Sequence, residues 1–157
     1  SGAHGGRVNN LRLGESILLG CETLHRRMID GLHPDAITLV AEVIESKIKS
    51  TQPCGSLAQT AFGTRPIAKK RRDIVQTILA IGIQDVDPSG LRPPKGTEII
   101  GCSSDHLITT SSVESLPVGA EMTFQLNYSA LMRAMTSPFV TRSIKSEDNV
   151  SGLCETR

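Results

Sequence analysis

Three of the acidic and imidazole side chains that could transfer protons stand in two short stretches of the sequence. Asp85 closes the first stretch, residues 80–85. Asp105 and His106 stand side by side in the second stretch, residues 100–107. Carboxylates and imidazoles are the usual general acids and bases of enzymes. Asp85, Asp105 and His106 are therefore the candidate catalytic residues.

Each of these residues also has a purely structural interpretation. Asp85 and Asp87 precede Pro88 and Gly90, and Asp residues in such a context commonly form turns through their own side chains. His106 could equally be a half-buried imidazole with its hydrogen bonds satisfied. The residues alone leave both interpretations open.

A glycine precedes the first predicted helix. Gly14 lets another group approach the backbone closely, and Glu15 lies in the first turn of the helix. Free backbone N–H groups and the helix dipole together favour a phosphate at such a position. The simpler alternative is an ordinary turn that begins a helix.

The elements that must position these residues are mostly strands. The chain has 157 residues, of which 38% are hydrophobic and only 3% aromatic, so Ile, Leu and Val must form the core of one domain. Apolar runs and alternation predict strands at 36–49, 74–83, 97–108 with an interruption at 103–105, 122–126 and 139–144. Short helices are predicted near 15–24 and 129–135, and a loop at 52–70. This order favours a mainly β fold, barrel-like or a sandwich.

Charge and cysteine content argue against several functions. Seventeen basic and 16 acidic residues give a net charge of +1, which provides no overall field for nucleic acid or a membrane surface. The basic run at 69–72 lacks interleaved aromatic residues and is interpreted as a solvated loop. The four cysteines are widely spaced, which predicts reduced thiols in a cytoplasmic protein and no metal site.

Three stretches, in the same order, resemble the carboxy-terminal part of fold-type III pyridoxal-phosphate racemases, in particular the alanine/ornithine racemase group. They are Arg12-Leu13-Gly14-Glu15-Ser16-Ile17-Leu18-Leu19-Gly20, then Ala80-Ile81-Gly82-Ile83-Gln84-Asp85 with residues 100–107, and Asn127-Tyr128-Ser129-Ala130-Leu131 ending at Ser137-Pro138-Phe139-Val140. No single stretch is specific, and the ordered set carries the resemblance. It extends over most of residues 8–144.

The resemblance implies a set of cofactor contacts. Arg12 would face the pyridine nitrogen of pyridoxal phosphate, where a permanent positive charge keeps that nitrogen unprotonated and weakens the ring as an electron sink. The N–H groups of Gly14 and Glu15 and the hydroxyl of Tyr128 would bind the phosphate. Weak electron withdrawal favours return of the proton to the same carbon, which suits racemisation.

The resemblance also implies contacts to a small amino-acid substrate across a dimer. Ser104 would bind the substrate carboxylate through its backbone N–H, and Asp105 would orient a neighbour. Racemisation needs acid/base groups on both faces of the α-carbon. Alanine racemases carry a Tyr at the position of Ile83. Because an isoleucine side chain cannot transfer a proton, the second base is left unidentified.

The Schiff-base lysine of the family is not identifiable, because none of the six lysines has its sequence context: Lys47, Lys49, Lys69, Lys70, Lys95 and Lys145. We expect a barrel of roughly 200 residues to precede Arg12. Residues 1–10 are then a scar or a remnant of that region, 11–30 the end of the barrel, 31–145 the β-domain and 146–157 a flexible tail. The alternative is a non-catalytic β-domain for dimerisation or ligand binding that has lost the barrel.

Overall fold

The computed structural model describes residue 10 and residues 12–51, 73–112 and 115–145. Several sequence-based expectations lie outside these residues: the remnant at 1–9, the loop at 52–70, the basic run at 69–72 and the tail at 146–157.

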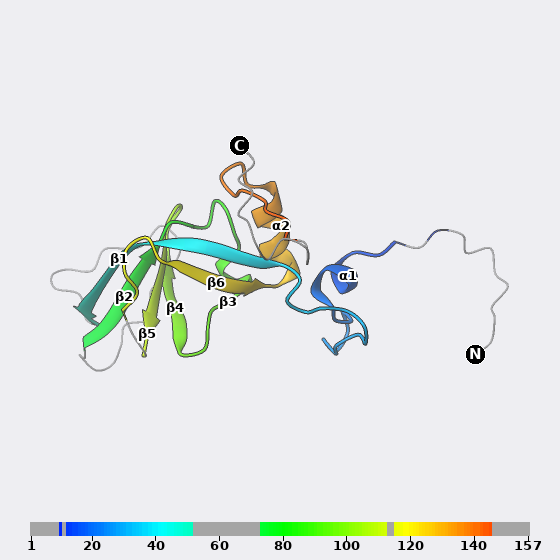
Figure 1. Cartoon of the computed structure of the whole chain (residues 1–157), viewed down its shortest axis with the longest axis horizontal. Coiled ribbons are helices and arrows are strands. Elements are labelled where there is room, and N and C mark those ends of the chain that lie inside the picture. The colour runs from blue at the N-terminus through cyan, green and yellow to red at the C-terminus, as the bar shows by residue number, and fades with distance from the viewer. Residues whose placement is uncertain (1–9, 11, 52–72, 113–114, 146–157) are drawn as a thin grey trace.

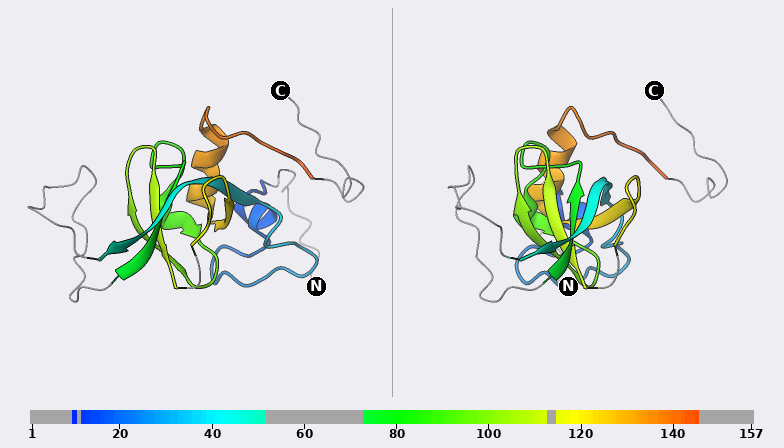
Figure 2. Two further views of the ribbon diagram at one scale, coloured as in Figure 1. Left: turned by 60° about the vertical axis from the view of Figure 1, so that its left-hand side comes forward. Right: turned by 90° about the vertical axis from the view of Figure 1, so that its left-hand side faces the viewer.

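Within the described ranges, six antiparallel strands form one sheet in the order β3-β6-β1-β2-β5-β4. The strands are β1 (Thr38–Ser50), β2 (Asp73–Leu79), β3 (Leu91–Arg92), β4 (Thr97–Cys102), β5 (Leu107–Ser111) and β6 (Glu121–Leu126). The long strand β1 pairs with β6 through its first half and with β2 through its second half. Its register shifts between Val43 and Glu45, and such irregularities bend a strand. The sheet curls around its own core (Figure 1, Figure 2), which confirms the predicted barrel-like, mainly β fold.

Alternation along the strands buries one face of the sheet. In β1, Leu39, Ala41 and Val43 point into the core, and the residues between them are exposed. Phe124 on β6 is fully buried, and burying such a side chain stabilises a fold by about 1.5–3 kcal/mol. Residues from both halves of the sheet belong to one cluster, so the domain has a single core.

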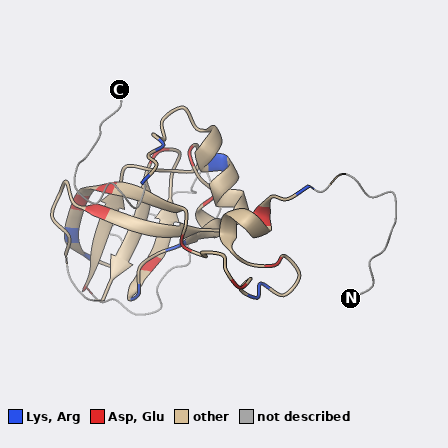
Figure 3. Cartoon of the chain, turned by 45° about the vertical axis from the view of Figure 1, so that its right-hand side comes forward, with Lys and Arg blue, Asp and Glu red and all other residues tan. Residues whose placement is uncertain are grey.

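Two helices flank the sheet. The helix α1 (Glu15–Leu19) lies beside one end of it, and α2 (Tyr128–Thr136) packs Ala130 and Ala134 into the core. A short 3-10 turn, η1 (Pro88–Gly90), contacts α2. In the view of Figure 3, acidic and basic residues are interspersed over the described part of the chain. No helix in the described ranges has the length and apolarity needed to cross a bilayer.

Three predicted elements were wrong in extent or in kind. The first helix ends at Leu19, because Gly20 adopts a left-handed φ of 64° and the chain then folds back to bridge Cys21 with Met28. The strand predicted at 74–83 ends at Leu79, because the following residues form a turn. Residues 139–144 form no strand.

The remaining predicted elements were confirmed to within two or three residues. The predicted helix at 129–135 corresponds to α2, and the pair of strands around residues 103–105 corresponds to β4 and β5. No pattern in the sequence predicted β3, which has only two residues.

Candidate functional site

We divide the predicted site residues into two groups by the elements that carry them. We call Arg12, Gly14, Glu15 and Tyr128 the α1 group. We call Asp85, Ser104, Asp105 and His106 the turn group. Tyr128 is the first residue of α2, whereas Asp85 contacts Ser137, which follows the last. The nine residues of α2 span about 13 Å at ~1.5 Å per residue, so Tyr128 and Asp85 are separated by roughly the length of this helix.

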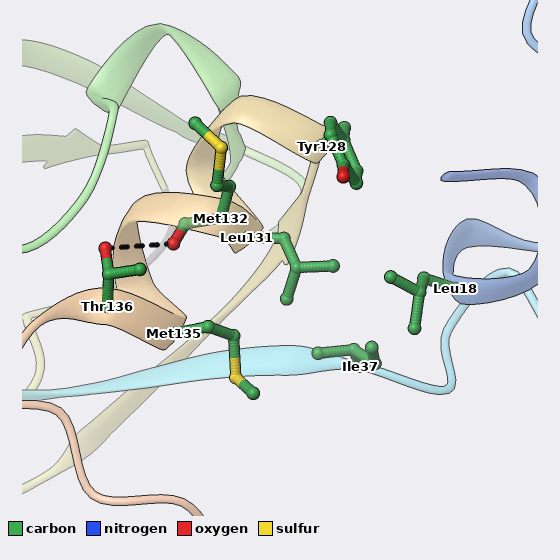
Figure 4. A pocket seen from close by; sticks show the side chains of 7 residues that line it. All are labelled: Leu18, Ile37, Tyr128, Leu131, Met132, Met135 and Thr136. Carbon is green, nitrogen blue, oxygen red and sulfur yellow. Dashed lines mark hydrogen bonds between the residues drawn. The ribbon is translucent and has the colours of Figure 1, made fainter. Parts of the chain in front are cut away.

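A pocket of about 230 Å³ lies between α1 and α2. Tyr128 and Leu18 face each other across it, and Ile37, just before β1, lines it as well (Figure 4). The rest of its wall is formed by Leu131, Met132, Met135 and Thr136. The structure therefore places Tyr128 beside the helix that Gly14 begins.

The start of α1 presents backbone N–H groups without a side-chain cap. Gly14 is the N-cap residue, and its carbonyl accepts from the N–H groups of Ile17 and Leu18, each at 3.1 Å. A Cβ atom at Gly14 would meet none of the described residues within 4 Å, so a side chain would have room at this position. Arg12 is exposed two residues earlier.

Arg26 forms an ion pair with Glu15 in the first turn of α1. Arg26 has a φ of 58°, which is unusual for a residue other than glycine. The turn that carries it is held by Glu22, whose carboxylate accepts from the N–H groups of Leu24, His25 and Arg27 at 2.6, 2.7 and 3.1 Å. The backbone hydrogen bond from Arg27 is the main cause that lowers the pKa of Glu22, and the bond to Glu15 raises the pKa of Arg26. Sequence reasoning missed Arg26, because only the fold-back of residues 20–29 brings it to α1.

The turn group is built from two turns that pack against each other. The N–H of Ile83 donates to the carbonyl of Ser103 at 3.0 Å, and the N–H of Gln84 donates to that of Ser104 at 2.9 Å. A Cβ on Gly82 would lie 2.3 Å from the Ser104 carbonyl oxygen, so only glycine fits there. The two titratable stretches singled out in the sequence therefore meet in space.

Asp105 and His106 form a carboxylate–imidazole pair at the surface. The Nδ1 atom of His106 lies 3.2 Å from Oδ1 of Asp105, and both side chains are about half exposed. The hydroxyl of Ser104 donates to the same carboxylate at 2.9 Å and is the main cause that lowers the pKa of Asp105. A carboxylate at this distance can orient the imidazole ring, and a general acid or base needs such positioning.

Asp85 and Asp87 lie close in sequence but in different surroundings. Asp85 is 5% exposed and accepts a hydrogen bond from the Ser137 hydroxyl at 2.7 Å. Asp87 caps η1 by accepting from the N–H of Ser89 at 3.0 Å, and it accepts from the hydroxyl of Ser129 at 2.6 Å. The bond from Ser129 is the main cause that lowers the pKa of Asp87. The turn-forming interpretation is therefore confirmed for Asp87.

The sequence is similar to two curated proteins. Ornithine racemase from Acetoanaerobium sticklandii is 39% identical over 140 residues, which cover 87% of this chain and 40% of that protein. Lysine racemase from Thermotoga maritima is 39% identical over 137 residues, covering 86% of this chain and 39% of that protein. The chain thus spans about two fifths of the length of these relatives. No family model matches the sequence, and no solved structure matches it.

Proposed function

Because this chain is related to ornithine and lysine racemases, as its sequence motifs predicted, we propose that it forms the carboxy-terminal β-domain of a pyridoxal-phosphate amino-acid racemase. The observation that carries the proposal is the 39% identity over 87% of the chain. The names of both relatives favour an amino acid with a basic side chain as substrate. The free thiols of Cys21 and Cys102 are compatible with a cytoplasmic location.

The residues of the α1 group fit the phosphate of such a cofactor. No described residue would crowd a Cβ on Gly14, the helix start lacks a side-chain cap, and Tyr128 lines a pocket with Leu18 of the same helix. The carboxylate of Glu15 would repel a phosphate dianion, but its ion pair with Arg26 offsets that charge. We therefore assign the phosphate to the N–H groups of Gly14 and Glu15 and to the Tyr128 hydroxyl.

The cofactor, when bound, would supply the electron sink that makes the α-proton of the substrate acidic. Arg12 would face its pyridine nitrogen and, by remaining charged, would keep that nitrogen unprotonated. A weaker sink favours return of the proton to the α-carbon. Arg12 would thus direct the chemistry toward racemisation.

The turn group would act on the substrate. Ile83 carries no transferable proton, whereas the imidazole of His106 lies in the adjoining turn and is oriented by Asp105. We assign His106 as the acid/base group on one face of the α-carbon, and the lysine of a preceding barrel as the group on the other face. The backbone N–H of Ser104 would bind the substrate carboxylate.

The separation of the two groups supports a dimer. Tyr128 begins α2, whereas Asp85 is bound to Ser137 just after its end, so one domain offers these two residues at two different places. We propose that the α1 group serves the active site of its own subunit and the turn group that of the partner. A two-fold symmetric dimer would then complete both sites.

A mixing experiment with the full-length racemase, barrel included, tests this arrangement. One inactive subunit carries Arg12→Ala and the other His106→Ala, and racemisation is followed by chiral chromatography. If each site combines Arg12 of one subunit with His106 of its partner, mixed dimers regain one intact site and recover activity. Absence of recovery in verified mixed dimers would contradict the shared site.

A simpler measurement tests the assignment to racemases itself. The chain alone is expected to show no turnover and no lysine–cofactor absorbance, whereas the chain joined to its barrel racemises ornithine or lysine. Turnover by the chain alone, or an inactive joined protein with a folded barrel, would refute the proposed function.

A further inference from the structure

The segment 83–90 runs along α2 in the opposite direction and is fastened to it at four points. Two lie at the carboxyl end of the helix, where Arg133 donates to the Ile83 carbonyl and Ser137 donates to Asp85. Two lie at the amino end, where Ser129 donates to Asp87 and the N–H of Asn127 donates to the Gly90 carbonyl. The helix and the segment therefore form one structural unit.

Asp85 differs from the other fastening residues by its burial. Among the described residues, Asp85 is the one buried carboxylate. A buried carboxylate is costly unless hydrogen bonds compensate for the lost water, and the Ser137 hydroxyl supplies one at 2.7 Å. The same Ser137 oxygen accepts from the N–H of Phe139 at 3.1 Å, which fixes the hydroxyl in place.

The turn at 82–85, which contains Asp85, is hydrogen-bonded to the residues just before Asp105 and His106. The N–H of Asp85 donates to the Gly82 carbonyl at 3.0 Å, closing the turn. Ile83 and Gln84 then donate to the carbonyls of Ser103 and Ser104. A continuous path of hydrogen bonds thus leads from the end of α2 to the residues that precede Asp105 and His106.

We propose that Asp85 is a positioning residue: through Ser137 it fixes the turn at 82–85 on α2 and thereby sets the place of Ser104, Asp105 and His106. Its carboxylate transfers no proton. The effect on catalysis rests on the proposed function, but the structural role does not.

Amide hydrogen exchange tests the structural role in the chain itself. Ser137→Ala removes the donor to Asp85, and Ser129→Ala is a matched control because it removes the same kind of bond at the other end of α2. The readout is the exchange rate of the Gln84 amide divided by that of the Thr77 amide in β2. We expect Ser137→Ala to raise this ratio about tenfold, as for a local opening, and Ser129→Ala to leave it unchanged. An unchanged ratio in Ser137→Ala, or an equal rise in both variants, overturns the inference.

Kinetics of the full-length racemase separate positioning from proton transfer. Asp85→Asn keeps an oxygen that accepts from Ser137, so it should retain kcat/KM to within about fivefold, whereas Asp85→Ala should lower it by on the order of 10²-fold through misplacement. Cofactor affinity, measured by absorbance titration, should stay constant in both. If Asp85→Asn loses as much activity as Asp85→Ala, Asp85 transfers a proton and the inference fails. An inactive wild-type enzyme would count against the proposed function alone, since the exchange experiment is independent of turnover.

Discussion

The missing side chain of Gly82 allows the two turns of the turn group to meet. An alanine there would place its Cβ 2.3 Å from the carbonyl oxygen and 2.4 Å from the carbonyl carbon of Ser104, and neither atom belongs to a flexible side chain. We expect Gly82→Ala to reduce the free energy of unfolding by about 1–3 kcal/mol, the usual cost of overpacking. Urea denaturation measures this loss. The control Thr123→Ala, on the exposed face of β6, should change it by less than about 0.5 kcal/mol, and equal stabilities of the two variants would show that the turns can separate freely.

Asp87 makes stability depend on pH in a predictable direction. Its pKa in the folded protein lies below the ordinary 3.8, chiefly because Ser129 and Ser89 donate to the ionised carboxylate. The stabilisation is therefore fully present above pH 3.8 and is lost as the pH falls below that value through the folded-state pKa.

We expect Asp87→Asn to lose less stability than the wild type between about pH 5 and about pH 2, because the substituted side chain does not titrate. Urea unfolding at both pH values measures the difference. Ser129→Ala should reduce the acid sensitivity in the same direction, since it removes the main donor. Identical pH profiles of Asp87→Asn and wild type would disprove this role.

At the residue scale, the sequence predicted which groups have suitable chemistry better than it predicted their partners. Asp105 and His106 are adjacent in sequence, so their contact needs little tertiary information. The partner of Asp85 lies 52 residues away, and Arg26 reaches Glu15 only through a fold-back. Such contacts depend on the path of the chain, which side-chain types alone do not specify.

The stability of α2 depends on the residue that caps its amino end, and this dependence can be measured. The side chain of Asn127 accepts from the N–H of Ala130 at 2.9 Å and so caps the helix beside Tyr128. Asn127→Ala should cost about 1 kcal/mol, whereas Asn127→Asp should keep the cap and cost less. Thermal unfolding ranks the two variants. An alanine variant as stable as the aspartate variant would mean that the cap does not hold the start of α2.

At the scale of elements, alternation predicted β1 and β6 because one face of each is buried. The same reasoning extended β2 too far, since 80–83 is as apolar as a strand but lies in a turn that packs on the neighbouring turn. It also predicted a strand at 139–144, where Phe139 is 75% and Ile144 96% exposed. Apolar composition indicates a strand only where a partner strand is present, and composition does not reveal the partner.

At the scale of the whole molecule, α1 and α2 carry several exposed apolar side chains. Leu13, Ile17 and Leu18 on or before α1, and Tyr128, Met132 and Met135 on α2, are all at least 39% exposed. Contiguous exposed apolar surface commonly marks an interface. The proposed function gives it one occupant, the barrel that precedes Arg12 in the racemase.

Methionine oxidation can test whether the barrel covers this apolar surface. Met132 and Met135 are 53% and 46% exposed, so dilute peroxide should oxidise both readily in the chain alone, while Met122, which is 4% exposed, stays protected. In the protein joined to its barrel, packing against the barrel should slow oxidation of Met132 and Met135 by about tenfold or more, because susceptibility follows exposure. Met122 provides an internal control for intact folding, and the rates are read by mass spectrometry of peptides. Equal rates for Met132 and Met135 with and without the barrel would show that the barrel packs elsewhere, and the α1 group would then not face the cofactor of its own subunit.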